Sequence, residues 1–298
     1  MPAESNKPRQ TASATPVASG STSAIIAATM ARIRSLLPGQ PEAVNLTCFG
    51  ALLMCLALQV WRPFYFLHND NVIGVYPAWV EFGRRLWSGR SPFVSDYLFG
   101  GFDLLRDPGA LGVWNPLLWL ASPLAITPAR LAIVDVVATL NLLLCAFAFS
   151  HLLVQLSRNE DDATGTNRLS TGRIVFLSLS YTFSVWALVI GTNWLTFLGN
   201  QASLPILFLG LLHARRRTGI ILVTCGLLHG LIAGHLNSFV FSLVFISFFL
   251  TVCAILERSA ERLVRWAAAG AITLVLVGFP LFLAYGGFCG AAGDSSGL

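Results

Sequence analysis

Charge is scarce in this sequence. Lys, Arg, Asp and Glu together make up 11% of the 298 residues, whereas 55% are hydrophobic and the mean hydropathy is +0.70. Soluble domains carry about 25% charged residues, and so few charges cannot cover a globule of this size. The composition therefore excludes a soluble globular protein and predicts an integral membrane protein.

Lysine and paired cysteines are also lacking. Lys7 is the only lysine among 19 basic residues. The arginines lie in short loops between apolar runs, a pattern that suits lipid headgroups and phosphates and does not indicate a nucleic-acid partner. The six cysteines are widely spaced, with no CxxC pair and no Cys/His metal spacing, so we interpret them as small buried hydrophobic residues.

Apolar runs of about 20 residues recur along the chain and predict an all-α, polytopic membrane bundle of about seven transmembrane helices. The expected spans are residues 46–66, 129–156, 174–192, 198–214, 219–234, 237–256 and 266–285. Together they form a transmembrane domain over 45–285. A long outer loop at 67–128 interrupts it, and a short outer tail at 286–298 follows it.

The region before the first span, residues 1–44, is expected to be a cytoplasmic tail. Residues 1–22 are rich in Ser, Thr, Ala and Pro and predict disorder. The stretch 24–39 is at most a surface helix, because Arg32 and Arg34 interrupt it. Their position after the apolar run does not fit a secretory signal peptide.

Basic residues alternate between loops in a way that predicts an orientation. With the N-terminus in the cytoplasm, the outer loops near 193–197 and 235–236 and the tail 286–298 contain no Arg or Lys. The cytoplasmic segments then contain Lys7, Arg9, Arg32, Arg34, Arg158, Arg168, Arg173, Arg215, Arg216, Arg217, Arg258, Arg262 and Arg265.

The segment after the first span is the exception to this alternation, because it places five arginines outside: Arg84, Arg85, Arg90, Arg106 and Arg130. Long loops are translocated largely regardless of charge, so the orientation stands. Arginines on the side that topology disfavours nevertheless require another explanation.

A short amphipathic helix is expected within this loop, opened by Pro77. Its apolar side comprises Trp79, Val80, Phe82, Leu86 and Trp87, and its polar side Glu81, Arg84, Arg85 and Ser88. Glu81 can pair with either arginine at helical spacing. Such a helix is either an interfacial anchor or part of a functional site. The short apolar run at 114–119, interrupted by Pro116, is expected to be re-entrant or interfacial.

The loop and two later segments resemble a known family. The stretches NDNVIGVYPAWVEFGRRLWSGRSPFVSDYLFGGFDLL and WNPLLWLASPL resemble the first outer loop of YfhO-like bacterial membrane proteins, which belong to the GT-C class of polytopic glycosyltransferases. GLIAGHLNSFVF (230–241) and NQASLPILFLGLLHARRR (200–217) are similar to later segments of that family. The resemblance covers roughly residues 46–285, and members of the family are usually longer.

The resemblance implies a glycosyltransferase of the bacterial cytoplasmic membrane, which moves a sugar from a polyprenyl-phosphate donor to an acceptor glycan or lipid on the outer face. Asp70 matches the position of the catalytic base in that class. Because polyprenyl phosphate is a good leaving group, one carboxylate suffices and displacement inverts the anomeric centre.

The resemblance implies further site residues. Arg84, Arg85 and Arg106 are expected to hold the donor phosphate. Asp96, Asp103 or Asp107 is a candidate second acid, which together with Asp70 would hold Mg²⁺ or Mn²⁺. His68, His235 and Asn237 are candidates for binding sugar hydroxyls.

Alternatives remain open at this point. Asp70 can equally be a solvated group or a helix cap, and Asp96, Asp103 and Asp107 fit turns beside Gly or Pro. The alternative functions are a membrane transporter subunit and a non-catalytic membrane scaffold. Spans three to seven contain no charged residue in their interiors, which favours a surface reaction over transport. Asp135, in the second span, is expected to face the bundle or water.

Overall fold

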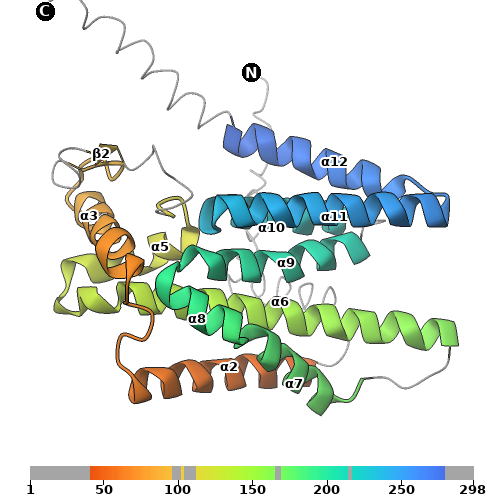
Figure 1. Ribbon diagram of the computed structural model, residues 1–298, viewed down its shortest axis with the longest axis horizontal. Coiled ribbons are helices and arrows are strands. Elements are labelled where there is room, and N and C mark those ends of the chain that lie inside the picture. Colours follow the sequence, from red (N-terminus) through yellow and green to blue (C-terminus); the bar gives the residue numbers. More distant parts are fainter. Residues whose placement is uncertain (1–40, 96–101, 104–111, 165–168, 214–216, 279–298) are drawn as a thin grey trace, which may run out of the picture. The chain divides into compact units, whose positions relative to one another are not determined.

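The computed structural model describes residues 41–95, 102–103, 112–164, 169–213 and 217–278 (Figure 1). The described helices all fall within one compact unit that extends from Glu42. The expected tail and surface helix before residue 40, the tail at 286–298, and Asp96, Arg106 and Asp107 lie outside the described residues.

The elements, in chain order, are α2 (Pro41–Trp61), η1 (Asn71–Val75), α3 (Tyr76–Trp87), β1 (Val94–Ser95), β2 (Phe102–Asp103), α5 (Pro116–Ala121), η3 (Ser122–Ile126), η4 (Pro128–Ala132), α6 (Ile133–Thr164), α7 (Thr171–Thr182), α8 (Val185–Asn193), α9 (Thr196–Leu212), α10 (Arg217–Ala233), α11 (Leu236–Glu257), α12 (Glu261–Thr273) and η5 (Leu274–Gly278).

Four helical stretches are long and apolar enough to cross a membrane, which confirms a helical membrane protein in coarse outline. These stretches are Pro41–Trp61, Pro128–Arg158, Thr171–Asn193 and Asn237–Leu256. They correspond to the first, second, third and sixth expected spans. The helices α9 and α10 are also apolar but have 17 residues each.

The first span begins and ends about five residues before its expected limits. It ends at Trp61 because Arg62 precedes Pro63, and a residue before proline is disfavoured in the helical conformation. Phe64 then adopts a φ of 59°, in the left-handed region, which turns the chain back toward the bundle.

The third span is not continuous, contrary to expectation. It divides into α7 and α8 at Phe183 and Ser184, and the Ser184 hydroxyl caps the second half by accepting a bond from the Ala187 N–H. The Gln201 Nε2 group donates to the carbonyl oxygens of Tyr181 at 2.6 Å and Thr182 at 3.4 Å. The carbonyls freed by the break are thus satisfied by a side chain from α9.

The helix α9 lies between α6 and α10 and packs against both (Figure 1). Glycine permits its close approach to α10, because a Cβ on Gly210 would lie 2.6 Å from the Val223 nitrogen and 2.7 Å from its Cγ2. Between membrane helices, where water does not drive association, small residues of this kind allow backbones to pack closely.

A two-residue antiparallel ladder in the long loop was not expected from an all-α prediction. Val94 pairs with Asp103, and Ser95 pairs with Phe102. The interpretation of Asp103 as a turn residue is therefore wrong, because its backbone lies in a strand.

Replacing Gly210 with alanine should lower the stability of the bundle. A methyl group at this position meets backbone atoms of α10 that cannot move aside, and overpacking of this kind costs about 1–3 kcal/mol. The matched control is Gly270→Ala in α12, where nothing lies within 4 Å of the added Cβ. Thermal unfolding followed by circular dichroism measures both variants, and equal midpoints would contradict the packing described.

Candidate functional site

Three chain segments meet at one end of the helices: the loop after α2, the α8–α9 turn and the α10–α11 turn. The Asn71 side chain, which is fully buried, joins the first two. Its Nδ2 donates to the carbonyl oxygens of Phe66, Gly191 and Thr192 at 2.8–3.0 Å, and its Oδ1 accepts from the Leu195 N–H at 3.0 Å. We call the place where the three segments meet the junction.

Asp70 precedes Asn71 and is exposed at the surface of the junction. Its Oδ2 accepts a hydrogen bond of 2.5 Å from the indole Nε1 of Trp194, in the α8–α9 turn. Asp70 occupies the position before η1, but its side chain makes no capping hydrogen bond. The helix-cap interpretation is therefore wrong, and the carboxylate is oriented by an indole.

Asn69, the residue before Asp70, forms a second hydrogen bond between the same loop and the α8–α9 turn. Asn69 has a φ of 45°, in the left-handed region that asparagine tolerates better than most residues. Its amide Nδ2 donates to Asn193 Oδ1, one position before Trp194. Two consecutive side chains of the loop thus bind two consecutive side chains of the turn.

His235 enters the junction from the α10–α11 turn. Its ring stacks on Phe197 with centroids 4.7 Å apart and lies 6.1 Å from the Trp194 ring. The turn is held by the Asn200 Nδ2, which donates to the His235 carbonyl oxygen at 3.0 Å. The structure thus brings together two of the residues expected at the site, Asp70 and His235, and links them through Trp194.

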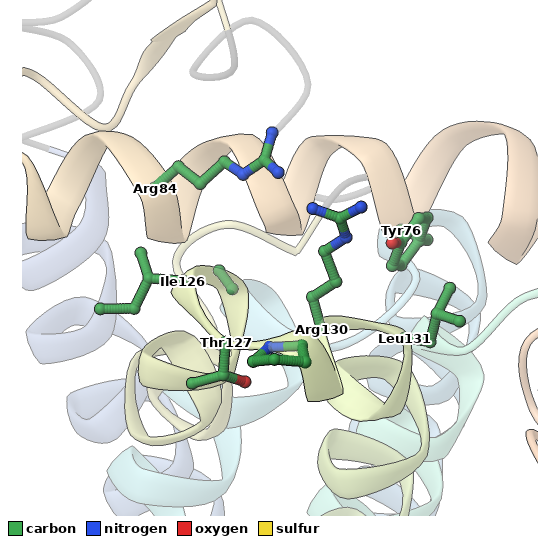
Figure 2. Close-up of a pocket in the computed structure, with 8 residues that line it drawn as sticks. Tyr76, Arg84, Ile126, Thr127, Arg130 and Leu131 are labelled. Atoms are coloured by element: carbon green, nitrogen blue, oxygen red, sulfur yellow. The ribbon is translucent and has the colours of Figure 1, made fainter.

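A second feature is a cleft of about 770 Å³ beside α3. It is lined by Tyr76, Arg84, Ala125, Ile126, Thr127, Pro128, Arg130 and Leu131. Figure 2 shows Arg130 reaching from η4 toward α3, on which Arg84 lies. Within the described residues, neither arginine forms a salt bridge, so the cleft carries two positive charges without a carboxylate partner.

The cleft depends on the close approach of α3 to η3. A Cβ on Gly83 would lie 2.5 Å from the Ala125 Cβ and 2.8 Å from the Ser122 carbonyl oxygen. Trp79 and Phe82 are buried on the same helix, and the Trp87 indole donates to the Ser122 hydroxyl at 3.1 Å. The apolar side of α3 is therefore largely occupied by protein and is not left free to enter lipid.

The other arginine expected on α3, Arg85, is engaged elsewhere. It lies 3.7 Å from Glu81, as the helical spacing predicted, and its Nε donates to the Ser91 carbonyl oxygen at 2.8 Å. Arg84 lines the cleft and Arg85 does not. The second arginine of the cleft is Arg130, whereas the sequence had suggested Arg85.

His68 and Asp135 lie inward from the junction. The Asp135 Oδ1 accepts from Gln59 Nε2 at 2.7 Å and from the Phe66 N–H at 3.0 Å, and the residue is buried as expected. The Asp135 Oδ2 and the His68 Nε2 are buried, and neither has a hydrogen-bond partner among the described residues. His68 is half-buried and its Nε2 is therefore not offered at the surface, whereas Asn237 is exposed in the first turn of α11.

Sequence reasoning missed Trp194, Asn71, Tyr76 and Arg130 as members of these sites. Arg130 carried one usable signal, because it is an arginine on the disfavoured side of the membrane. The others carried none. For metals, the described ranges contain no group of three or more His, Cys, Asp or Glu residues that could hold an ion.

No protein-family model, curated protein or solved structure matches the chain.

Replacing Asn71 with alanine should destabilise the junction. The change leaves the Leu195 N–H and buried carbonyls without partners, and each such group costs about 1–3 kcal/mol. The control is Asn237→Ala, an exposed asparagine at the same end of the helices. Thermal unfolding in detergent distinguishes them, and an Asn71→Ala midpoint equal to that of the control would contradict the network described.

Proposed function

We propose that the protein is an inverting membrane glycosyltransferase that moves a sugar from a polyprenyl-phosphate donor to an acceptor glycan or lipid on the extracytoplasmic face. The observation that carries the proposal is the cleft lined by Arg84 and Arg130, neither of which has an acidic partner among the described residues. Arg84 lies on α3, and the helical run of η1 and α3 begins next to Asp70. Arginine forks match phosphate oxygens, and charge-assisted bonds of this type are among the strongest in proteins.

The position of the cleft suits a lipid-linked phosphate. Arg130 lies two positions after the start of the apolar stretch Pro128–Arg158, and Asp70 lies nine residues after the first span ends. The Gln59–Asp135 hydrogen bond places the end of that first span beside the start of α6. Both features therefore lie near one boundary of the apolar helices, where a phosphate headgroup with a lipid tail would be found.

The spacing along the helical run brings one end of the cleft near Asp70. Tyr76 lines the cleft and lies six residues after Asp70, which corresponds to about 9 Å along a helix axis. The anomeric carbon is bonded to the phosphate oxygen, so the phosphate must bind at this Tyr76 end of the cleft. In this arrangement the long side chains of Arg130 and Arg84 extend to the phosphate there, and the anomeric carbon lies between the phosphate and Asp70.

The chemistry assigned to Asp70 is that of a general base. Asp70 takes the proton of the acceptor hydroxyl, the new bond forms between that oxygen and the anomeric carbon, and the bond to the phosphate oxygen breaks. Trp194 holds the Oδ2 of Asp70, and within the described residues Oδ1 has no hydrogen-bond partner. The carboxylate is thus oriented while one oxygen is left to accept a proton.

The proposal includes seven spans and a cytoplasmic N-terminus, as a protein of the bacterial cytoplasmic membrane. The helices α9 and α10 and the expected span 266–285, of which residues 279–285 lie outside the described residues, would supply the spans beyond the four long stretches. Support comes from the junction, where contacts join the three segments that the arginine distribution assigns to the outside.

A membrane transporter is the second candidate, and the broken α7–α8 span is the observation in its favour. Discontinuous helices often bind ions through freed carbonyls. Here the carbonyls of Tyr181 and Thr182 accept from Gln201 instead, so the break does not present them to an ion. The unpaired arginines and exposed carboxylate favour the enzyme.

Asp70→Asn is expected to abolish sugar transfer while leaving the fold intact. Asparagine keeps an oxygen for the Trp194 indole but cannot accept the proton, and a general base contributes typically about 10²–10⁴-fold to rate. Transfer from a polyprenyl-phosphate hexose is measured with the protein in liposomes, and unfolding midpoints verify the fold. Normal transfer by Asp70→Asn would rule out the assigned base.

Arg84→Gln and Arg130→Gln are each expected to weaken binding of a short-chain polyprenyl phosphate by about tenfold or more, because each removes a charge-assisted bond. Phosphorus NMR line broadening measures the binding. Arg90→Gln is the matched control, since Arg90 is an exposed arginine of the same loop that does not line the cleft. Equal losses in all three variants would indicate general attraction to the positive surface and contradict a phosphate site.

A further inference from the structure

Three aromatic rings at the junction lie nearly parallel. Trp194 and Phe197 are inclined by 20°, Phe197 and His235 by 21°, and Trp194 and His235 by 22°. The Trp194–Phe197 centroids are 5.6 Å apart, and the Trp194–His235 distance of 6.1 Å is far less than the sum of the other two distances. The rings therefore form a compact triangular cluster instead of a linear pile, and we call this cluster the platform.

The platform is partly open. The Trp194 side chain is 46% exposed, while Phe197 and His235 are half-buried. The structure of the turns keeps the rings in place, because a Cβ on Gly199 would lie 2.2 Å from the Ala233 carbonyl oxygen and the Asn200 amide binds the turn. An aromatic surface that is already rigid loses little entropy when a ligand is bound.

Polar groups surround the platform. The Asp70 carboxylate accepts from the Trp194 indole, the amides of Asn69 and Asn193 lie beside it, and the His235 Nδ1 lies 3.4 Å from the Ser238 hydroxyl. This rim offers both donors and acceptors. Together with the rings, it matches a pyranose, whose C–H bonds form an apolar face and whose hydroxyls radiate from the edge.

The geometry favours a sugar over a cationic headgroup. Sites for quaternary ammonium groups are aromatic cages, in which rings surround the charge from several directions. Here the rings are stacked on one another within 22° of parallel, so they do not surround a common point. The exposed part of Trp194 can cover the face of a sugar ring, but the stack does not enclose a cation.

We propose that the platform binds the acceptor sugar: the sugar stacks on the exposed part of Trp194, which Phe197 and His235 support from behind and beside, and directs one hydroxyl toward Asp70. This inference rests on the proposed function, because it identifies the acceptor as carbohydrate at the residue that binds it. Trp194 then has two roles: its ring binds the acceptor, and its N–H orients the carboxylate.

Glycoside binding tests the platform without any transfer reaction. The full chain is placed in lipid nanodiscs, because the headgroup of a maltoside detergent would compete for the site. Methyl glycosides of several hexoses are the probes, and saturation-transfer NMR detects binding. The wild-type protein should bind at least one of them, with transfer strongest to the C–H protons of one face of the sugar.

Two substitutions at one position separate the two roles of the indole. Trp194→Ala removes the ring and should weaken glycoside binding by about tenfold or more. Trp194→Phe keeps a stacking ring but loses the N–H, so glycoside binding should be largely retained while transfer falls. Trp61→Phe and Trp61→Ala are the matched controls, because Trp61 is exposed at 74% at the end of α2 and belongs to neither the platform nor the cleft.

The outcomes distinguish this inference from the proposed function. Glycoside binding that depends on Trp194, without detectable transfer from any polyprenyl donor, would support the platform and overturn the enzyme. Transfer that proceeds with unchanged acceptor KM in Trp194→Ala would overturn the platform and leave the enzyme in place. Absence of binding of every glycoside probe to the wild type, or equal binding by the wild type and Trp194→Ala, would overturn the inference.

Discussion

One buried amide determines how the functional end of this protein is arranged. Asn71 makes four hydrogen bonds to backbone groups, three in the α8–α9 region and one in its own loop. It is the buried link between the loop that carries Asp70 and the turn that carries Trp194, and the Asp70–Trp194 and Asn69–Asn193 bonds join the same two segments at the surface. A buried side chain with all of its groups satisfied stabilises a unique arrangement, whereas one with a missing partner would be costly. The carboxylate and the indole take their positions from this link, whereas the His235 turn is held by Asn200.

The cleft and the junction carry charges of opposite sign. The cleft holds two arginines that lack acidic partners among the described residues, and the junction holds an exposed carboxylate. Asp135 is buried nearby with one oxygen bound by Gln59 and the Phe66 N–H and the other unsatisfied. Groups of this kind are expensive near lipid and are retained mainly where function requires them. The protein concentrates them around the loop after its first span, while the later spans remain free of charge.

Sequence reasoning worked where one local signal dominates. The four long spans follow from hydropathy, α3 follows from Pro77 and its apolar periodicity, and the Glu81–Arg85 pair follows from helical spacing. Sequence reasoning failed where a residue far away in the sequence determines the local structure. Asp70 and Trp194 are 124 positions apart, and nothing near either one identifies the other. The carbonyls at the break near Phe183 are bound by Gln201 of α9. Which of Arg84 and Arg85 lines the cleft depends on how closely Gly83 approaches η3.

The lengths of α9 and α10 have a consequence for the surrounding lipid. A helix of 17 residues extends about 25 Å, whereas the hydrocarbon core of a bilayer is about 30 Å thick. If both helices cross the membrane, the bilayer thins where they contact lipid, chiefly along α10, because α9 is enclosed between α6 and α10. α9 begins and α10 ends at the junction, so the depression would lie beside it. Lipid headgroups would sink there toward the protein, which would shorten the path of the proposed polyprenyl-phosphate donor to the arginines.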